Sequence, residues 1–201
     1  MKTDRYGELL LPSAGYRRLK SFQLARLIYD ITVRFVELYI PAASRTGDQM
    51  VQAARSGVQN IAEGSMDAAT STKLELKLYN VARASLEELR LDYQDYLRQH
   101  GCTIWDKDSP LYADFVAARI STTSGFRDFI SRAESSSPSV NIRNIPYKSV
   151  LVANGALLLI ASASYFLQRQ IAAKVQTFMT DGGFSERMSR MRTKQKASAN
   201  Q

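Results

Sequence analysis

Residues 20–41 read KSFQLARLIYDITVRFVELYIP, and their apolar side chains recur every three or four positions, the period of a helix. Two sets of apolar side chains share this period and cover different faces. The first set is Phe22, Ala25, Tyr29, Val33, Val36 and Ile40, and the second is Leu24, Leu27, Ile28, Ile31, Phe35 and Leu38. A helix that is apolar on most sides must be buried on most sides. We therefore expect it to need a second contact, either another subunit or the C-terminal region, and we expect Pro41 to end it.

Two more helices follow at the same period. The first covers residues 45–63 and is closed by Gly64, since glycine suits the left-handed turn that ends a helix. Thr72 and Glu75 match a capping box, so the next helix is predicted over residues 73–99. Its predicted inward side chains are Leu74, Leu78, Val81, Ala82, Ser85, Leu89, Tyr93 and Tyr96 or Leu97.

A fourth helix is predicted over residues 110–133. Ser109 and Pro110 suit a helix start, with serine as the cap and proline in the first turn. The stretch 121–125 has low helical propensity, so we expect a break near Gly125.

Residues 147–180 form a predicted fifth helix with an unusually apolar middle. Positions 150–167 carry no charge, and 18 residues is near the lower limit for a membrane span. Asn154 and other small or polar residues interrupt this run, so we favour a buried helix of a soluble protein and keep a membrane-associated protein as the less favoured alternative. After Gly182 and Gly183, a short basic helix is predicted.

No strand-like alternation persists anywhere in the chain. The predicted fold class is therefore all-α: an antiparallel four-helix bundle followed by a linked long helix and a short basic C-terminal helix. Four parts are predicted along the chain. They are a bundle with a basic N-terminal arm at 1–133, a serine-rich linker at 134–146, a helical suffix at 147–193 and a disordered basic tail at 194–201.

Composition excludes several classes of site. The chain of 201 residues has one cysteine, Cys102, and one histidine, His100, which excludes an internal disulfide, a four-cysteine zinc site and any mechanism that needs two imidazoles. No Glu-x-x-His motif occurs, so a carboxylate di-metal bundle is also excluded. We expect no metal and no cofactor. The single cysteine and the lack of an apolar leader predict a cytoplasmic protein.

Positive charge gathers toward the two ends of the sequence. The net charge is +8, with +3 over residues 1–20, −2 over 21–141, +3 over 142–184 and +4 over 185–201. Basic segments attract polyanions such as RNA, DNA or an anionic membrane surface. A soluble basic tail without a partner would have the same composition. Further basic residues, Lys2 and Arg5, lie in the N-terminal arm.

Several segments together resemble a known family. Residues 49–64 read QMVQAARSGVQNIAEG and residues 78–89 read LYNVARASLEEL. Both resemble the bacterial four-helix bundle proteins first known from intervening sequences of large-subunit ribosomal RNA genes. The accessory variability determinant of diversity-generating retroelements belongs to the same superfamily. Residues 20–25 fit as well, and 157–171 with 181–186 are similar to a suffix region that some members carry, so the resemblance spans about 16–133 and 147–193.

The resemblance implies a homo-oligomer, typically a pentamer, without enzymatic activity. In the retroelement branch it also implies a basic surface that binds nucleic acid and a reverse transcriptase. The residues that we predict to bind nucleic acid are Arg17, Arg18, Lys20, Arg55, Arg83, Arg187, Arg190, Arg192, Lys194 and Lys196. No sequence-reading motif accompanies them, so recognition of the backbone or of shape is expected.

Some of these residues also allow a structural interpretation. Arg55 and Arg83 could contact phosphate or could pair with Glu63, Glu87 or Glu88 inside the bundle. For Asn60 and Glu63 we favour hydrogen bonds that tie helix ends together, because buried polar groups are nearly always paired. His100 and Cys102 are interpreted as turn residues rather than as a thiolate pair, since no third group orients them.

The hypothesis from sequence is a non-enzymatic homo-oligomer that binds nucleic acid through basic termini, with RNA favoured over DNA. A role as the accessory subunit of a reverse transcriptase is left open. The alternative is a protein–protein interaction scaffold that does not bind nucleic acid. We expect no membrane partner.

Overall fold

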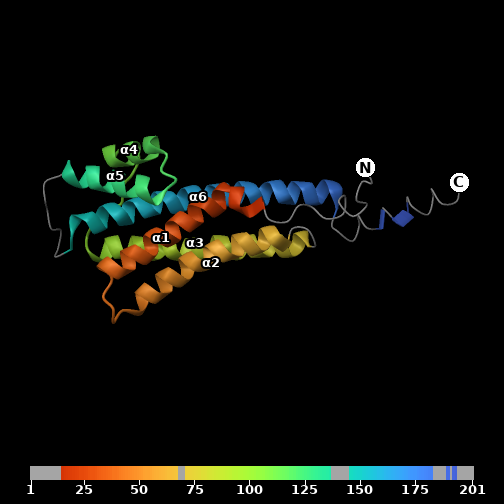
Figure 1. Ribbon diagram of the computed structural model, residues 1–201, viewed down its shortest axis with the longest axis horizontal. Helices are drawn as coiled ribbons and strands as arrows, with labels where there is room; N and C mark the ends of the chain where they lie inside the picture. The colour runs from red at the N-terminus through yellow and green to blue at the C-terminus, as the bar shows by residue number, and fades with distance from the viewer. Residues whose placement is uncertain (1–14, 68–70, 137–144, 183–188, 191, 194–201) are drawn as a thin grey trace.

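The computed structural model describes residues 15–67, 71–136, 145–182, 189–190 and 192–193. Over this part of the chain every regular element is helical, so the predicted all-α class is confirmed (Figure 1). A short 3₁₀ helix, η1 (Gly15–Arg18), precedes the α-helices. These are α1 (Lys20–Tyr39), α2 (Arg45–Asp67), α3 (Thr72–Gln99), α4 (Pro110–Ala118), α5 (Thr123–Ser135) and α6 (Tyr147–Asp181).

An antiparallel four-helix bundle is formed by α1, α2, α3 and α6. Helix α1 packs against α2 and α6, and α3 packs against the same two helices. The direction of α6 follows from contacts at both of its ends. Ser21 at the start of α1 donates a hydrogen bond to Gln170 at 2.8 Å, and Tyr96 near the end of α3 donates one to Ser149 at 2.9 Å. Figure 1 shows α6 running along the length of the bundle.

The fourth helix of the bundle is thus not the one that the sequence pattern predicts. Residues 110–133 supply α4 and most of α5, which have 9 and 13 residues and span about 14 and 20 Å at 1.5 Å per residue. They are too short to lie along α3, which has 28 residues. The 35-residue α6 is long enough and its apolar middle closes the core. The boundary between a bundle at 1–133 and a suffix at 147–193 is therefore wrong, because the predicted suffix helix is part of the bundle.

The second apolar face of α1 is covered by the same chain. Leu24, Ile28, Ile31 and Phe35 are all buried, and α1 contacts α5 as well as α2 and α6. Of the two contacts that the sequence left open, the structure supplies the C-terminal region. The outward Leu38 remains 51% exposed.

Helix α2 does not end at Gly64, as predicted, but continues to Asp67. Gly64 lies within the helix, where a Cβ atom would come within 2.8 Å of the Tyr79 ring on α3. The glycine is therefore required for close packing of two helices and not for a turn.

The start of α3 also differs by one residue from the prediction. Ser71 is the cap, and its hydroxyl accepts a hydrogen bond from the Leu74 amide. Glu75 does not complete a capping box. Its side chain is buried and forms an ion pair with Lys174 of α6, with Nζ and Oε1 3.1 Å apart. Within α3, Tyr79 and Leu86 are buried, whereas Leu74 and Val81, predicted to face inward, are about 40% exposed.

The break between α4 and α5 lies at residues 119–122, ahead of Gly125. Arg119 adopts a left-handed conformation with φ of 46°, which ends α4. Thr122 then caps α5 by accepting a hydrogen bond from the Gly125 amide at 3.1 Å. The threonine cap, and not the glycine, sets the position of the break.

One stretch, residues 147–180 of α6, is long and apolar enough to cross a membrane by length and composition. Its most apolar window is 61% buried within the fold, as expected of a core helix. Several predictions lie outside the described residues: the N-terminal arm at 1–14, most of the linker, and the tail at 194–201. Of the predicted basic C-terminal helix, only residues 189–190 and 192–193 are described, and they are helical.

Candidate functional site

The predicted nucleic-acid-binding residues do not form one patch. Arg17, Arg18 and Lys20 are exposed on η1 and at the start of α1. Arg55 and Arg83 are exposed on α2 and α3, the other pair of bundle helices. Arg190 and Arg192 are exposed past the end of α6, whereas Arg187, Lys194 and Lys196 lie outside the described residues.

Neither Arg55 nor Arg83 forms an ion pair within the part of the chain that the structure describes. Glu87, one of the proposed partners, pairs instead with Arg90 on its own helix. Hydrogen bonds from that guanidinium lower the pKa of the Glu87 carboxyl. The pairing of Arg55 and Arg83 inside the bundle is therefore wrong, and both side chains are open to solvent.

Asn60 satisfies its amide locally. Its Nδ2 donates to the Ser56 carbonyl oxygen at 2.9 Å and to the Ser56 hydroxyl at 3.2 Å. The Ser56 hydroxyl also shares a hydrogen bond of 2.8 Å with Ser85 on α3. The asparagine thus links α2 to α3 through serine, in the middle of the helices and not at their ends. Glu63 is exposed.

A larger feature, which we call the α1 groove, runs between α1 and the α4–α5 pair. It consists of three adjoining hollows. The aromatic hollow of about 690 Å³ is lined by side chains that include Lys20, Tyr112, Arg119, Tyr165 and Phe166. The central hollow of about 350 Å³ includes Arg17, Phe22, Arg26, Asp30 and Ser121. The apolar hollow of about 280 Å³ includes Asp30, Arg34, Phe35, Arg127 and Lys148.

The three hollows adjoin one another, and neighbouring hollows share lining residues. Gln23 and Ser121 line both the aromatic and the central hollow. Asp30 and Thr123 line both the central and the apolar hollow. The α1 groove is therefore a row of three adjoining hollows beside α1.

Cationic side chains outnumber acidic ones in the described lining of the α1 groove. Asp30 is the single acidic residue in it. Two of the cations are paired: Arg34 with Glu37 at 3.0 Å, and Lys148 with Glu134 at 2.7 Å. The other five form no ion pair within the described residues, namely Arg17, Lys20, Arg26, Arg119 and Arg127. Their field is available to an anionic ligand.

Two different elements bring these cations together. On α1, Arg26, Asp30 and Arg34 recur at four-residue intervals and so lie on one stripe of the helix. Arg119 and Arg127 come from the end of α4 and from α5, about ninety positions later in the chain. Sequence analysis identified Arg17 and Lys20 but missed Arg26, Arg119 and Arg127. The four-residue spacing was a weak signal, and the pairing of α1 with α5 was not visible in the sequence.

A second groove, which we call the acidic groove, lies between α2 and α3. Its lining includes Asp48, Glu88 and Asp92 and no cationic residue. Burial, followed by repulsion from Asp95 and Glu88, raises the pKa of the Asp92 carboxyl. Since α2 and α3 form the side of the bundle opposite α1 and α6, the two grooves lie on opposite faces. Figure 1 shows α4 and α5 above the bundle and α2 below it.

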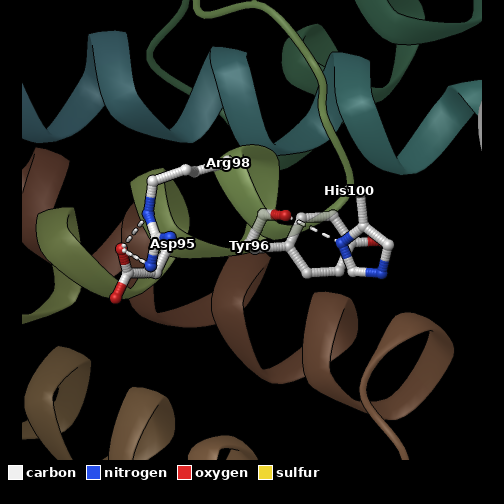
Figure 2. A network of polar contacts seen from close by, with 4 residues as sticks. All are labelled: Asp95, Tyr96, Arg98 and His100. Carbon is white, nitrogen blue, oxygen red and sulfur yellow. Dashed lines mark hydrogen bonds and ion pairs between the residues drawn. The ribbon is translucent and has the colours of Figure 1, made fainter.

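The side chains of His100 and Cys102 form local hydrogen bonds to backbone oxygens at the end of α3. Figure 2 shows the His100 ring directed at the Tyr96 carbonyl oxygen, with Nδ1 2.7 Å from it. Cys102 Sγ donates to the His100 backbone oxygen at 3.6 Å. Arg98 in the same turn pairs with Asp95 at 3.0 Å (Figure 2). No group of three or more His, Cys, Asp or Glu side chains that could hold a metal ion occurs among the described residues.

A buried polar cluster lies near the opposite end of the bundle, around Tyr79. Burial and the adjacent Glu75 carboxylate raise the pKa of the Tyr79 hydroxyl. Lys174 neutralises Glu75, and Ser21 donates to Gln170 across the core. These contacts join α1, α3 and α6, and leave the cluster without an opening toward either groove.

Comparison with known proteins adds no relative: the chain matches no family model, no curated protein and no solved structure.

Proposed function

We propose that the protein binds nucleic acid, with RNA favoured over DNA, along the α1 groove. The observation that carries this proposal is the presence of five cations without an ion pair and one carboxylate in the described lining of three adjoining hollows. A nucleic acid presents a regular row of phosphates, and such a row suits an elongated basic surface better than it suits scattered charges. The proposal keeps Arg17 and Lys20 from the sequence-based set and adds Arg26, Arg119 and Arg127.

The chemistry of the groove favours recognition of the backbone. Arginine guanidinium groups present several fixed N–H donors that match phosphate oxygens. Four of the five unpaired cations are arginines, and all five are exposed. The preference for RNA rests on the resemblance described above.

The test compares two double variants with the same change in charge. Binding of a fluorescein-labelled oligouridylate is measured by anisotropy at 50 mM salt. Arg26→Glu with Arg127→Glu changes the α1 groove and should weaken binding by about 10- to 100-fold, because each phosphate contact contributes through counterion release. Arg55→Glu with Arg83→Glu changes exposed, unpaired arginines on α2 and α3 and should weaken it by less than about threefold.

Equal losses in the two variants would mean that net charge alone attracts the RNA and that the groove is not the site. If the unmodified protein does not bind RNA or DNA at 50 mM salt but co-purifies with one protein, the interaction scaffold replaces this proposal.

Self-association is a second proposal with its own observation. Large apolar side chains stay exposed toward the end of α6, where Val175 is 43%, Phe178 39% and Met179 77% exposed. Met66 and Leu74, at the same end of the bundle, are 46% and 41% exposed. Burial of such side chains in another copy is favourable by about 25 cal/mol per Å². Light scattering with size-exclusion chromatography tests this: Val175→Lys with Met179→Lys should reduce the measured mass to that of a monomer.

The expected pentamer and the role beside a reverse transcriptase rest on the resemblance alone. The mass from light scattering tests the first, and co-purification with a reverse transcriptase encoded nearby tests the second.

A further inference from the structure

The aromatic hollow holds rings that the bundle core does not use. Tyr165 is 54% exposed and Phe166 is 39% exposed, and they follow the largely buried stretch 150–160 of α6. The two rings stand edge to face with centroids 5.5 Å apart. Tyr112 of α4 lines the same hollow from the opposite side. Exposed aromatic rings that face a common depression are typical of binding surfaces.

Cationic groups surround these rings. Lys20 and Arg119 line the aromatic hollow. Arg169 lies over the Tyr165 ring, with Cζ 5.9 Å from its centroid, and donates a hydrogen bond to the Tyr165 hydroxyl at 3.3 Å. A stacked guanidinium holds the ring in place and adds positive charge next to it.

The aromatic hollow also adjoins the central hollow of the α1 groove. Gln23 and Ser121 form the shared wall with the central hollow, where Arg17 and Arg26 lie. A ligand that fits this combination has a flat π-face on one side and phosphates on the other. Proteins that bind single strands combine a basic track with aromatic rings on which bases stack.

We infer that the aromatic hollow receives unpaired bases, so that the substrate is single-stranded rather than duplex nucleic acid; the inference rests on the proposed function. A duplex keeps the faces of its bases stacked inside and offers only phosphates and edges to a groove. A single strand lets a base turn toward Tyr165 and Phe166 while its phosphates stay beside Arg17 and Arg26.

Three probes of equal length separate the base from the backbone. They are a 15-nucleotide oligouridylate, an abasic sugar–phosphate strand and an RNA duplex, each labelled with fluorescein and titrated at 50 mM salt. The single strand should bind about tenfold more tightly than the abasic strand, since stacking contributes to affinity only when bases are present. It should also bind more tightly than the duplex.

A matched pair of variants locates the effect. Phe166 is 39% exposed and Leu91 of α3 is 50% exposed, and only Phe166 lines the hollow. Phe166→Ala should weaken binding of the oligouridylate by about 5- to 30-fold and leave binding of the abasic strand unchanged. Leu91→Ala should change neither, and Phe166→Tyr should restore affinity. Tyr165→Ser is the substitute if Phe166→Ala does not fold.

The outcomes distinguish the two proposals. Binding of all three probes with equal affinity, unaffected by Phe166→Ala, overturns the inference and leaves the proposed function standing. Absence of binding to every probe overturns both. A lower oligomeric mass of Phe166→Ala, with oligouridylate binding unchanged, shows that a second copy occupies the hollow and also overturns the inference.

Discussion

The two grooves of this bundle differ in charge, in shape and in how they are built. The α1 groove is bounded by α1, α4, α5 and α6, and its described lining holds seven cationic residues and one acidic residue. The described lining of the acidic groove, which comes from α2 and α3 alone, holds three acidic residues and no cation. The segment 21–141 has a net charge of only −2 and contributes to both. The difference teaches that, within this nearly neutral segment, the fold sorts positive and negative side chains onto different faces.

Packing explains why the two grooves differ in shape. Helices α2 and α3 approach closely at Gly57 and Gly64, where a Cβ atom would meet Leu86 at 3.2 Å and the Tyr79 ring at 2.8 Å. On the outer side of this seam both helices contribute polar side chains to the acidic groove, among them Gln52, Ser85 and Glu88. The α4–α5 pair instead lies beside α1 and leaves an open depression between them.

The largest expected difference between the two grooves is the response of RNA binding to salt. If the five unpaired cations of the α1 groove each neutralise one phosphate, log K should fall with log salt at a slope of about −3.5. Affinity would then drop by about 10²-fold between 50 and 200 mM potassium chloride. Arg26→Gln should make the slope shallower by about 0.7, whereas Glu88→Gln in the acidic groove should not change it. Anisotropy titrations at four salt concentrations measure both, and a slope near zero for the unmodified protein would contradict the assignment.

The next largest effect is on the free energy of unfolding, through hydrogen bonds that anchor the segments around each groove. Asn154 is buried, accepts a hydrogen bond from the Trp105 amide at 2.7 Å and donates to the Thr103 carbonyl at 3.2 Å, which anchors the segment leading to α4. Asn154→Ala leaves the Trp105 N–H unsatisfied, so the free energy of unfolding should fall by about 1–3 kcal/mol. Thermal unfolding followed by circular dichroism and by the fluorescence of Trp105, the sole tryptophan, reports the change.

The counterpart in the acidic groove is Ser85→Ala, which removes the 2.8 Å hydrogen bond between Ser56 and Ser85. We expect a loss below about 1 kcal/mol, because Ser56 is only partly buried and keeps its contact with Asn60. If Asn154→Ala and Ser85→Ala lower the free energy of unfolding equally, the hydrogen bonds beside the two grooves contribute equally to stability.

A smaller effect is expected from the single carboxylate of the α1 groove. Asp30 lies on the same stripe of α1 as Arg26 and Arg34 and repels an approaching phosphate. Asp30→Asn should raise the affinity for oligouridylate by about two- to fivefold at 50 mM salt, because it removes one negative charge near the bound phosphates. Asp48→Asn in the acidic groove is the matched control and should raise it by less than twofold. If Asp48→Asn raises the affinity more than Asp30→Asn does, the RNA binds in the acidic groove.

The smallest effect is a pH-dependent change in stability at Asp92. Its pKa is raised in the folded state, so the folded protein holds this proton more tightly than the unfolded chain does. Protonation of Asp92 therefore stabilises the folded state. This stabilisation is complete below the ordinary pKa of an aspartate, and it is lost as the pH rises through the raised pKa of the folded state. Asp92→Asn should raise Tm at pH 7 by about 1–3 °C, a small shift because the site is partly solvent-screened.

At pH 3 the same variant should have the Tm of the unmodified protein, since both side chains are then neutral. Differential scanning calorimetry at the two pH values measures the change. A stabilisation of equal size at both pH values would mean that packing, and not charge, causes it.

The sequence was informative wherever a structural signal is local. The apolar period of residues 20–41 and the proline after them predicted α1 to within two residues, and α1 ends at Tyr39. The long apolar run predicted α6, and Ser109 with Pro110 predicted the start of α4. Each of these signals acts within one or two helical turns, so it does not depend on what the rest of the chain does.

Signals that depend on a partner were predicted less well. Gly64 was predicted to end α2 because a glycine that enables close packing and a glycine that ends a helix look alike in sequence; only Tyr79 on α3 distinguishes them. Glu75 fits a capping pattern, but Lys174, about a hundred positions later, pairs with it. Arg119 and Arg127 were missed for the same reason.

By itself, then, the sequence determined that this chain forms long helices and roughly where each one begins and ends, since a periodic apolar face needs only its own residues to be recognised. Only the tertiary structure decided that α6 and not residues 110–133 closes the bundle, that α6 covers the second face of α1, and that cations from α1 and α5 share one groove. Those outcomes depend on which faces match in length and shape, and two faces far apart in the chain meet only when the whole core is packed.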